Sequence, residues 1–384
     1  MEHRSIGTGG IAASVIGLGT EHLDGKSARE VDAVVSAALD GGINLLDVFM
    51  PGQEVRRNIG RALRGKRDQT LIQGHIGSVE VAGQYAVSRD IDLCTAYFES
   101  LLRALGVDRI DIGMLFFMDK ESSRRKVVDG PILPYVRRLK EQGVIRAVGA
   151  SAHNPAAARR LVEEGLIDLL MFSVNPAFDM APAGVDAVKA LDQGLNWEKS
   201  AGNERAALYR LCEASNVPIV SMKTLGAGKL LDGRLSPFAA PLSVSQCIHY
   251  ALTRPAVASA LVGCSSVEEV GAALAYLEAS PEERDFSGIL ERERSSFAHS
   301  CVYCNHCRPC PAGIDIAAVN RALDAALLDG QNAGARVLRR YRSLDKTAAS
   351  CTACGVCEAR CPFSVPIVER MAEARRLFDD QADV

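Results

Sequence analysis

Residues 14–48, "SVIGLGTEHLDGKSAREVDAVVSAALDGGINLLDV", contain one complete copy of the pattern that decides the fold. A short apolar run (14–19) is followed by a helical segment with a serine cap and a glycine stop, and then by a second apolar run, "INLLDV" (43–48). Neither run alternates strictly between apolar and polar residues, which is typical of parallel strands buried on both faces. The stretch therefore predicts a strand, a helix and a second, parallel strand.

The same pattern continues along the chain. Six further β-like runs lie at 70–75, 109–116, 145–151, 166–173, 217–223 and 257–263. Eight strand–helix units predict an α/β fold, a (β/α)8 TIM barrel over residues 1–280. A doubly wound open sheet is the alternative, but no GxGxxG follows the first strand. Residues 176–201 are an insertion after the sixth strand, which would form either a lid over the barrel mouth or an ordinary long loop.

Composition and charge exclude several classes of function. The chain has 384 residues, a formal net charge of −3 and 24% charged residues, as expected for a globular protein with one large and one small domain. Nothing in it suggests binding to nucleic acid or to a membrane surface, and no apolar run reaches the ~20 residues of a membrane span. The N-terminal residues "MEHRSIGTGG" lack the apolar segment of a secretory signal, so we expect a cytoplasmic protein.

The twelve cysteines fall into two groups. In a cytoplasmic protein they are not expected to form disulfides. Four occur singly, and we expect them to be small buried apolar side chains: Cys94, Cys212, Cys247 and Cys264. The other eight lie within residues 297–384, which we interpret as a separate module joined to the barrel by a charged linker at 281–296.

The eight clustered cysteines form two runs. "CVYCNHCRPCP" contains Cys301, Cys304, Cys307 and Cys310, and "CTACGVCEARCP" contains Cys351, Cys354, Cys357 and Cys361. The second run matches the C-x2-C-x2-C-x3-C-P spacing of bacterial two-cluster ferredoxins, and the first is a shortened version. In that arrangement the fourth cysteine of each run binds the other cluster. The spacing therefore predicts two [4Fe–4S] clusters, one on Cys301, Cys304, Cys307 and Cys361 and the other on Cys310, Cys351, Cys354 and Cys357. We expect a small, mainly α-helical, ferredoxin-like module, with two zinc sites as the alternative.

Several stretches of the barrel resemble the aldo-keto reductase superfamily. "GGINLLDV", "LGVDRIDIGML", "GVIRAVGASAHN", "MFSVN" and "ALTRPAVASALVGCSSVEEV" occur in the order expected for that superfamily, one branch of which carries a C-terminal dicluster module. The resemblance implies an oxidoreductase with its site at the barrel mouth. It places Asp47 at the catalytic aspartate, and Asn175 at an asparagine that binds the nicotinamide amide in relatives.

The departures from the superfamily's pattern concern its catalytic Asp–Tyr–Lys–His tetrad. The tyrosine is expected five residues after Asp47, where this chain has Gly52. The lysine position is His75, a feature that the iron–sulfur branch also favours, and the histidine position is Phe116. A barrel without the proton-donating tyrosine is not expected to reduce carbonyls with NADPH in the superfamily's usual way.

Two further departures concern the cofactor. Met222 stands where many relatives stack a tyrosine on the nicotinamide ring. Glu268 and Glu269 replace the basic residues that usually hold the 2′-phosphate of NADP, and their charges would repel it. Whether NAD(P) binds is therefore left open by the sequence.

Candidate site residues lie at the carboxyl ends of the predicted strands, which converge at the mouth of a barrel. They are Asp47, His75, Phe116, Asn175, Met222 and Lys223. We expect Asp47 to orient His75, whose imidazole can donate or accept a proton near neutral pH. The alternatives are a helix cap for Asp47, a packed core histidine, a structural amide for Asn175 and a rim lysine for Lys223. Gly74 and Gly77, on either side of His75, are expected to leave room for a ligand.

These features together predict an iron–sulfur oxidoreductase that acts on a small polar organic substrate. Electrons would come from a ferredoxin or flavodoxin-type carrier. A basic segment would be either the docking patch for this carrier or a solvated helix face: Arg336, Arg339, Arg340, Arg342 and Lys346. The alternatives are an NAD(P)H-dependent reductase coupled to the clusters, a non-catalytic electron carrier, and a redox-neutral lyase or isomerase.

Overall fold

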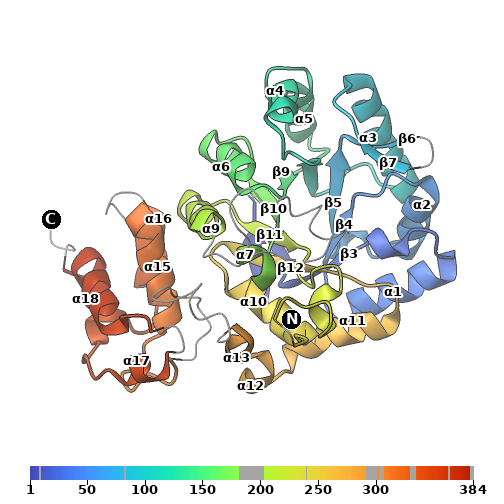
Figure 1. Ribbon diagram of the computed structural model, residues 1–384. Coiled ribbons are helices and arrows are strands. Elements are labelled where there is room, and N and C mark those ends of the chain that lie inside the picture. Colours follow the sequence, from blue (N-terminus) through green and yellow to red (C-terminus); the bar gives the residue numbers. More distant parts are fainter. Residues whose placement is uncertain are drawn as a thin grey trace.

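Eight parallel strands form a closed barrel, which confirms the predicted TIM barrel and excludes the open sheet (Figure 1). The computed structural model describes residues 1–7, 10–81, 84–180, 203–238, 240–290, 301, 307–328, 334–361 and 364–380. The barrel strands are β3 (Ile16–Gly19), β4 (Leu45–Val48), β5 (Leu71–Ile76), β8 (Ile112–Leu115), β9 (Ala147–Ala152), β10 (Leu169–Ser173), β11 (Ile219–Met222) and β12 (Val257–Gly263). Pairing of β12 with β3 closes the barrel. Each of the eight predicted runs overlaps one of these strands, and β5 and β9 extend one residue beyond theirs.

Helices cover the outside of the barrel. They are α1 (Ala28–Asp40), α2 (Gln53–Ala62), α3 (Ile91–Leu105), α4 (Glu121–Val128), α5 (Ile132–Glu141), α6 (Pro155–Glu163), α7 (Pro176–Asp179), α9 (Asn203–Ser215), α10 (Val244–Thr253) and α11 (Val267–Leu274). Short 3-10 turns are η1 (Glu21–Leu23), η2 (Arg67–Gln69), η3 (Lys229–Leu231) and η4 (Ala275–Leu277). Side-chain caps begin two of the predicted helices: Ser27 forms a capping box with Glu30 at α1, and Asn154 caps α6.

Two hairpins lie outside the strand–helix pattern and were not predicted. The first, β1 (His3–Ile6) with β2 (Ile11–Ser14), packs Ile6 and Ile11 against the apolar side chains inside the barrel. The second, β6 (Ser78–Val81) with β7 (Gln84–Val87), follows β5 directly. It therefore starts next to His75, at the barrel mouth.

The C-terminal region is helical in its described residues and lies on one side of the barrel (Figure 1). Its elements are α15 (Ile316–Leu328), α16 (Ala335–Arg342), η6 (Ala348–Ser350), α17 (Val356–Arg360) and α18 (Ile367–Phe378). Its apolar core is continuous with Phe178 and Tyr250 of the barrel side. Arg340 of α16 forms an ion pair with Glu213 of α9, and α15 packs along α9. The two regions therefore share a core.

Residues 281–290, inside the predicted linker, form two short helices, α12 (Pro281–Arg284) and α13 (Ser287–Leu290). The rest of the linker, most of the predicted insertion at 176–201, and Cys304 lie outside the described residues. The four single cysteines are buried, as expected, and burial raises the pKa of both Cys247 and Cys264 to about 12. In the described part of the chain, no helix is long and apolar enough to cross a bilayer.

Candidate active site

Asp47 and His75 form a buried pair at the barrel mouth. Asp47 lies in β4 and His75 in the neighbouring strand β5, and each residue is 2% exposed. The distance between Asp47 Oδ1 and His75 Nε2 is 2.7 Å. The structure thus brings together the two residues expected to interact. A carboxylate at this depth is costly unless it is paired, and the imidazole is one of its two side-chain partners.

Gln73 is the second partner, and it was not predicted. In the strand register Asp47 is opposite Gln73, and His75 points to the same face of β5 because it lies two residues further along. Gln73 Nε2 donates to Asp47 Oδ1 over 2.7 Å, whereas Gln73 Oε1 has no hydrogen-bond partner among the described residues. Alternation along β5 was the sequence signal for this residue, since a glutamine on the face of His75 must point into the barrel.

Aromatic rings enclose His75. The ring of Phe116 lies edge-on to the imidazole with centroids 5.3 Å apart, and Phe49 lies 6.0 Å from it. Tyr85, from the β6–β7 hairpin, contacts Phe49 edge-on at 5.9 Å. His75 Nδ1 is buried and has no hydrogen-bond partner among the described residues. The pair is therefore covered by apolar side chains, and Nδ1 is the ring nitrogen of His75 that no described protein group binds.

The expectation that Gly74 and Gly77 leave room for a ligand is wrong. A Cβ on Gly74 would lie 2.5 Å from Leu101 and 2.8 Å from Ile110, so this position faces the packing between β5 and its covering helix. Gly77 has φ of +97°, and its open side faces Arg89 and Ser88. Close packing and a left-handed backbone explain these two glycines.

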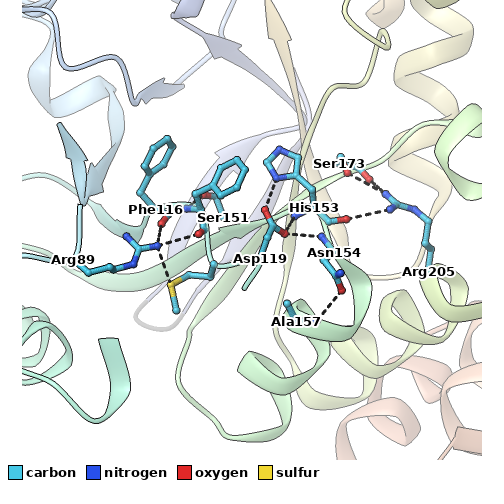
Figure 2. Close-up of polar contacts among 11 residues, drawn as sticks. Arg89, Phe116, Asp119, Ser151, His153, Asn154, Ala157, Ser173 and Arg205 are labelled. Atoms are coloured by element: carbon cyan, nitrogen blue, oxygen red, sulfur yellow. Dashed lines mark hydrogen bonds and ion pairs between the residues drawn. The ribbon is translucent and has the colours of Figure 1, made fainter. Parts of the chain in front are cut away.

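A second aspartate–histidine pair lies at the same end of the barrel, beyond β8 and β9 (Figure 2). Asp119 Oδ2 is 2.8 Å from His153 Nδ1, and Asp119 Oδ1 accepts hydrogen bonds from the backbone of His153 and Asn154. Burial acts to raise the pKa of Asp119, but the hydrogen bonds from His153 and the two backbone groups outweigh it, so this pKa is lowered. The sequence left His153 without a role and did not single out Asp119, which is 34 residues away from it.

Two arginines, the half-buried Arg89 and the buried Arg205, hold the loops around this second pair (Figure 2). Arg89 Nη2 donates to the carbonyl oxygens of Phe116 and Phe117, which fixes the turn after β8. Arg205 of α9 donates to the backbone of Ser173 and to the carbonyl oxygen of His153. These bonds tie the ends of β8, β9 and β10 together.

Asp179 is the counter-ion of Arg205. Its Oδ1 accepts from Arg205 Nε over 3.2 Å and from Tyr209 over 2.6 Å, and its Oδ2 accepts from Tyr250 over 2.7 Å. The Arg205 guanidinium also lies 4.4 Å from the ring centroid of Phe172. This network joins α7, α9 and α10 behind the mouth.

The remaining predicted barrel residues lie at the mouth but engage protein groups. Asn175 is fully buried; its Oδ1 accepts from Phe178 N and its Nδ2 donates to the carbonyl oxygen of Lys223. Lys223 has a left-handed φ of +57°, and its Nζ lies 3.6 Å from Glu21. Met222 is buried in the apolar interior of the barrel. A ligand role for these three residues stays a prediction.

Residues 15–241 match the model of the aldo/keto reductase family. The chain belongs to this family. It is an oxidoreductase by that membership, and two curated relatives from Bacillus subtilis agree with it. One, the uncharacterized oxidoreductase YqkF, is 24% identical over 70% of this chain and 89% of its own length. The other, the aldo-keto reductase YhdN, is 30% identical over 39% of this chain and 47% of its own length.

Solved aldo/keto reductase structures share the barrel. The aldo-keto reductase AKR11C1 from Bacillus halodurans, in its holo form, superposes with a TM-score of 0.57 at 22% identity, covering 76% of this chain and 96% of that one. The glycerol dehydrogenase AKR11B4 from Gluconobacter oxydans gives a TM-score of 0.56 at 19% identity, covering 76% and 95%. Almost the whole length of each corresponds to about three quarters of this chain. About a quarter of the chain has no counterpart in either structure.

The clustered cysteines of this aldo/keto reductase lie in its C-terminal region. Five of them pack at the edge of the apolar core that also contains the buried Cys307: Cys301, Cys310, Cys351, Cys357 and Cys361. Cys354 is exposed. Within the described residues, no three histidine, cysteine or acidic side chains are close enough together to hold a metal ion.

Proposed function

We infer that this chain is an iron–sulfur oxidoreductase that reduces or oxidises a small polar organic substrate at the barrel mouth. The observation that carries the proposal is the buried Asp47–His75 pair in a barrel without the family's tyrosine. Asp47 and His75 manage a proton there. The C-terminal cysteines would hold two [4Fe–4S] clusters, which would supply or accept the electrons of the reaction.

The hydrogen-bond pattern assigns the proton to one atom. Because the Asp47 carboxylate can only accept, His75 Nε2 carries the hydrogen of their bond. Nδ1 is then the ring nitrogen that exchanges a proton with the substrate. In the imidazolium form Nδ1 donates, and in the neutral form it accepts. The Asp47 carboxylate orients the imidazole through this bond. His75 Nδ1 is therefore the proton donor to the oxygen of a carbonyl substrate, and the acceptor in the reverse direction.

The second pair, Asp119 with His153, presents the opposite ring nitrogen. Asp119 holds His153 Nδ1, which leaves Nε2 of His153 as the free position. A two-electron reduction of a carbonyl takes up two protons, so a second proton-handling group at the same mouth suits it. Phe116 and Phe117 lie between the two imidazoles, with ring centroids 6.0 Å apart. They give the substrate an apolar wall between two acid/base groups.

The cysteine residues suit iron–sulfur clusters in their chemistry. Four thiolates per cubane is the usual donor set, and two runs supply eight. Apolar surroundings at five of them and the backbone N–H of Ala353, which lies 3.5 Å from Cys351 Sγ, are the environment in which cluster thiolates are usually found. When bound, the clusters would supply single electrons at potentials between about −700 and +450 mV. Cys301, Cys304, Cys307 and Cys361 would hold one, and Cys310, Cys351, Cys354 and Cys357 the other.

The electron source is a ferredoxin or flavodoxin-type carrier that docks on the basic residues beside the cysteines. Arg339, Arg342 and Lys346 are exposed, whereas Arg340 is engaged with Glu213 of the barrel. An acidic carrier would be attracted by these three charges.

A second candidate keeps a nicotinamide in the barrel, and family membership favours it. When bound, the nicotinamide would supply a hydride, and the clusters would connect it to a partner. By resemblance the 2′-phosphate of NADP would lie at the first turn of α11, where Glu268 and Glu269 stand and where Glu269 already accepts from Ser265 N over 2.6 Å. These residues do not fit a 2′-phosphate, so this candidate uses NADH.

Anaerobic purification of the full chain with iron and sulfide analysis tests the proposal first. We expect about eight irons per chain, and zinc in their place would contradict it. The chemically reduced protein is then mixed with a panel of small aldehydes, ketones and hydroxy acids, and reoxidation of the clusters is followed by absorbance. A substrate should speed reoxidation in the wild type.

Two variants and a control localise the chemistry. Asp47→Asn and His75→Gln should keep about eight irons but lose substrate-dependent reoxidation. His249→Gln, which changes a histidine away from the mouth, should keep both properties. If the two variants behaved like the control, the Asp47–His75 pair would not be the site. If NADH alone supported turnover while the clusters stayed silent, the second candidate would replace the first.

A further inference from the structure

A groove rich in arginine opens at the opposite end of the barrel from Asp47 and His75. It has a volume of about 1250 Å³ and lies where strands β5, β8 and β9 begin, between the carboxyl ends of α2 and α3. Thr70, Asp111 and Arg146 line it, and each precedes one of those strands. Because the candidate active site lies at the other ends of these strands, the groove is a separate feature.

The groove carries strong positive charge in a chain that is negative overall. Seven arginines and three aspartates line it, whereas the formal net charge of the whole chain is −3. Six of the seven arginines are exposed, and Arg67 is half-buried. The concave wall concentrates their field, because low-dielectric surroundings focus it into the cleft.

Asp111 organises the floor of the groove. It is 4% exposed and accepts from Arg67 Nη2 over 3.0 Å and from Arg146 Nη1 over 3.1 Å, as well as from the backbone of Ile72. Arg67 also donates to the carbonyl oxygen of Arg109. The buried carboxylate thus fixes two guanidinium groups at the entrance of the strands.

Three guanidinium groups of the groove have no partner among the described residues. The side chains of Arg57, Arg64 and Arg109 make no hydrogen bond or ion pair there, although the backbone carbonyl oxygen of Arg109 accepts from Arg67. A helix dipole attracts cations at a carboxyl end, which accounts for Arg61 and Arg103 in the last turns of α2 and α3. It does not account for Arg57, which lies mid-helix, or for Arg109 in the loop before β8.

The position of the groove decides against an electron carrier as its occupant. The helices α2 and α3 follow the second and third strands of the barrel, whereas the cysteine-bearing region packs on α9, which follows the sixth (Figure 1). A carrier docked in the groove would be separated from the cysteines by the barrel. The volume of the groove is only slightly larger than the roughly 300–1,000 Å³ of typical small-ligand pockets. The groove therefore suits a small molecule.

We propose that this groove binds a small molecule with two or more phosphate groups. Guanidinium groups form paired hydrogen bonds with phosphate oxygens, and arginine is preferred over lysine where such contacts are made. Arg67 and Arg146 are held in place by Asp111, and Arg57, Arg64 and Arg109 reach the phosphates from the sides. The site is independent of the reaction at the mouth.

Calorimetric titration of the full chain with inorganic tripolyphosphate and with ATP tests this proposal. We expect both to bind at about 0.01 M salt and to bind more weakly at about 0.15 M, where the Debye length falls from ~30 to ~8 Å. Tighter binding of ATP would show that a nucleoside is part of the ligand, and equal binding would show that the phosphates suffice. A protein that binds neither probe at low salt would overturn the proposal.

A double variant and a matched control locate the site. Arg64→Gln/Arg109→Gln should weaken binding about a hundredfold, about tenfold for each lost guanidinium, or ~1.4 kcal/mol apiece. Arg29→Gln/Arg376→Gln removes the same charge from exposed positions on α1 and α18 and should change the affinity less than threefold. Equal losses in the two double variants would show unspecific attraction and overturn the proposal, as would tighter binding of a nucleic acid oligomer than of tripolyphosphate.

Discussion

Removing Asp47 should destabilise the barrel through the donors that it leaves behind. Asp47→Ala removes the acceptor of His75 Nε2 and of one N–H of Gln73 Nε2, since both nitrogens lie 2.7 Å from Asp47 Oδ1. The weak contact of Gln73 Nε2 with Met171 Sδ remains. A buried donor without an acceptor costs about 1–3 kcal/mol, so the loss should be about 2–6 kcal/mol. Because Asp47 and His75 are each 2% exposed, solvent screening does not reduce this figure. The double variant Asp47→Ala/His75→Leu no longer contains the His75 donor. It should therefore lose about 1.5–3 kcal/mol less unfolding free energy than the sum of the losses of Asp47→Ala and His75→Leu.

Urea unfolding of the four proteins, followed by far-ultraviolet circular dichroism, measures this coupling. The slope of the unfolding free energy with urea should be the same in all four, so that the midpoints report stability alone. A matched cycle on Arg159 and Glu163, an exposed helical pair at 2.7 Å, should give about 0.3–0.5 kcal/mol. If the losses at Asp47 and His75 were additive within about 0.5 kcal/mol, the contact would not stabilise the site as reasoned.

Three further outcomes are expected. Asp179→Ala leaves the Arg205 guanidinium without its counter-ion and should lower the unfolding free energy by about 3–5 kcal/mol. Asp179→Asn should lower it by less. If the two variants lost the same unfolding free energy, an ionic role of Asp179 would be contradicted. Burial lowers the pKa of His249 to about 4, whereas in the unfolded chain the pKa of this histidine is near ~6.5. As the pH drops from ~6.5 towards about 4, the unfolded chain therefore takes up the proton first, and the free energy of unfolding falls. Over this window His249→Gln should flatten the plot of unfolding free energy against pH by up to ~1.4 kcal/mol per pH unit; an unchanged slope would show that His249 does not titrate as stated. Gly74→Ala should cost about 1–3 kcal/mol because the new Cβ would lie 2.5 Å from Leu101, and a neutral result in thermal unfolding would show that the packing there yields.

The arrangement of the barrel was predictable because it depends on local order along the chain. Each apolar run that lacks alternation must be buried on both faces, and a helix between two such runs makes them parallel. The runs at 14–19 and 257–263 therefore contain β3 and β12, the two strands that close the barrel. The hairpins β1–β2 and β6–β7 escaped prediction because each is a short antiparallel pair outside the repeating unit.

The candidate site was predictable only where it follows from strand ends. Asp47 and His75 end adjacent parallel strands, so topology alone brings them to one rim, and the 2.7 Å contact agrees with that expectation. Their roles, and the cluster assignment of the cysteines, remain predictions. Gly74 was misjudged because alternation along β5 was not applied to it: a residue next to the inward-facing His75 faces the covering helix, where Leu101 and Ile110 lie.

The sequence by itself determined the order of the strands, the caps that begin the helices, and the rim at which polar side chains gather, because each depends on neighbours in the chain. The tertiary structure alone decided which distant residues meet. Asp119 and His153 pair across 34 positions, and the groove collects Arg57, Arg109 and Arg146 from three separate loops and helices. Such contacts arise from the closure of the barrel, which sets the distance between side chains that no sequence spacing relates.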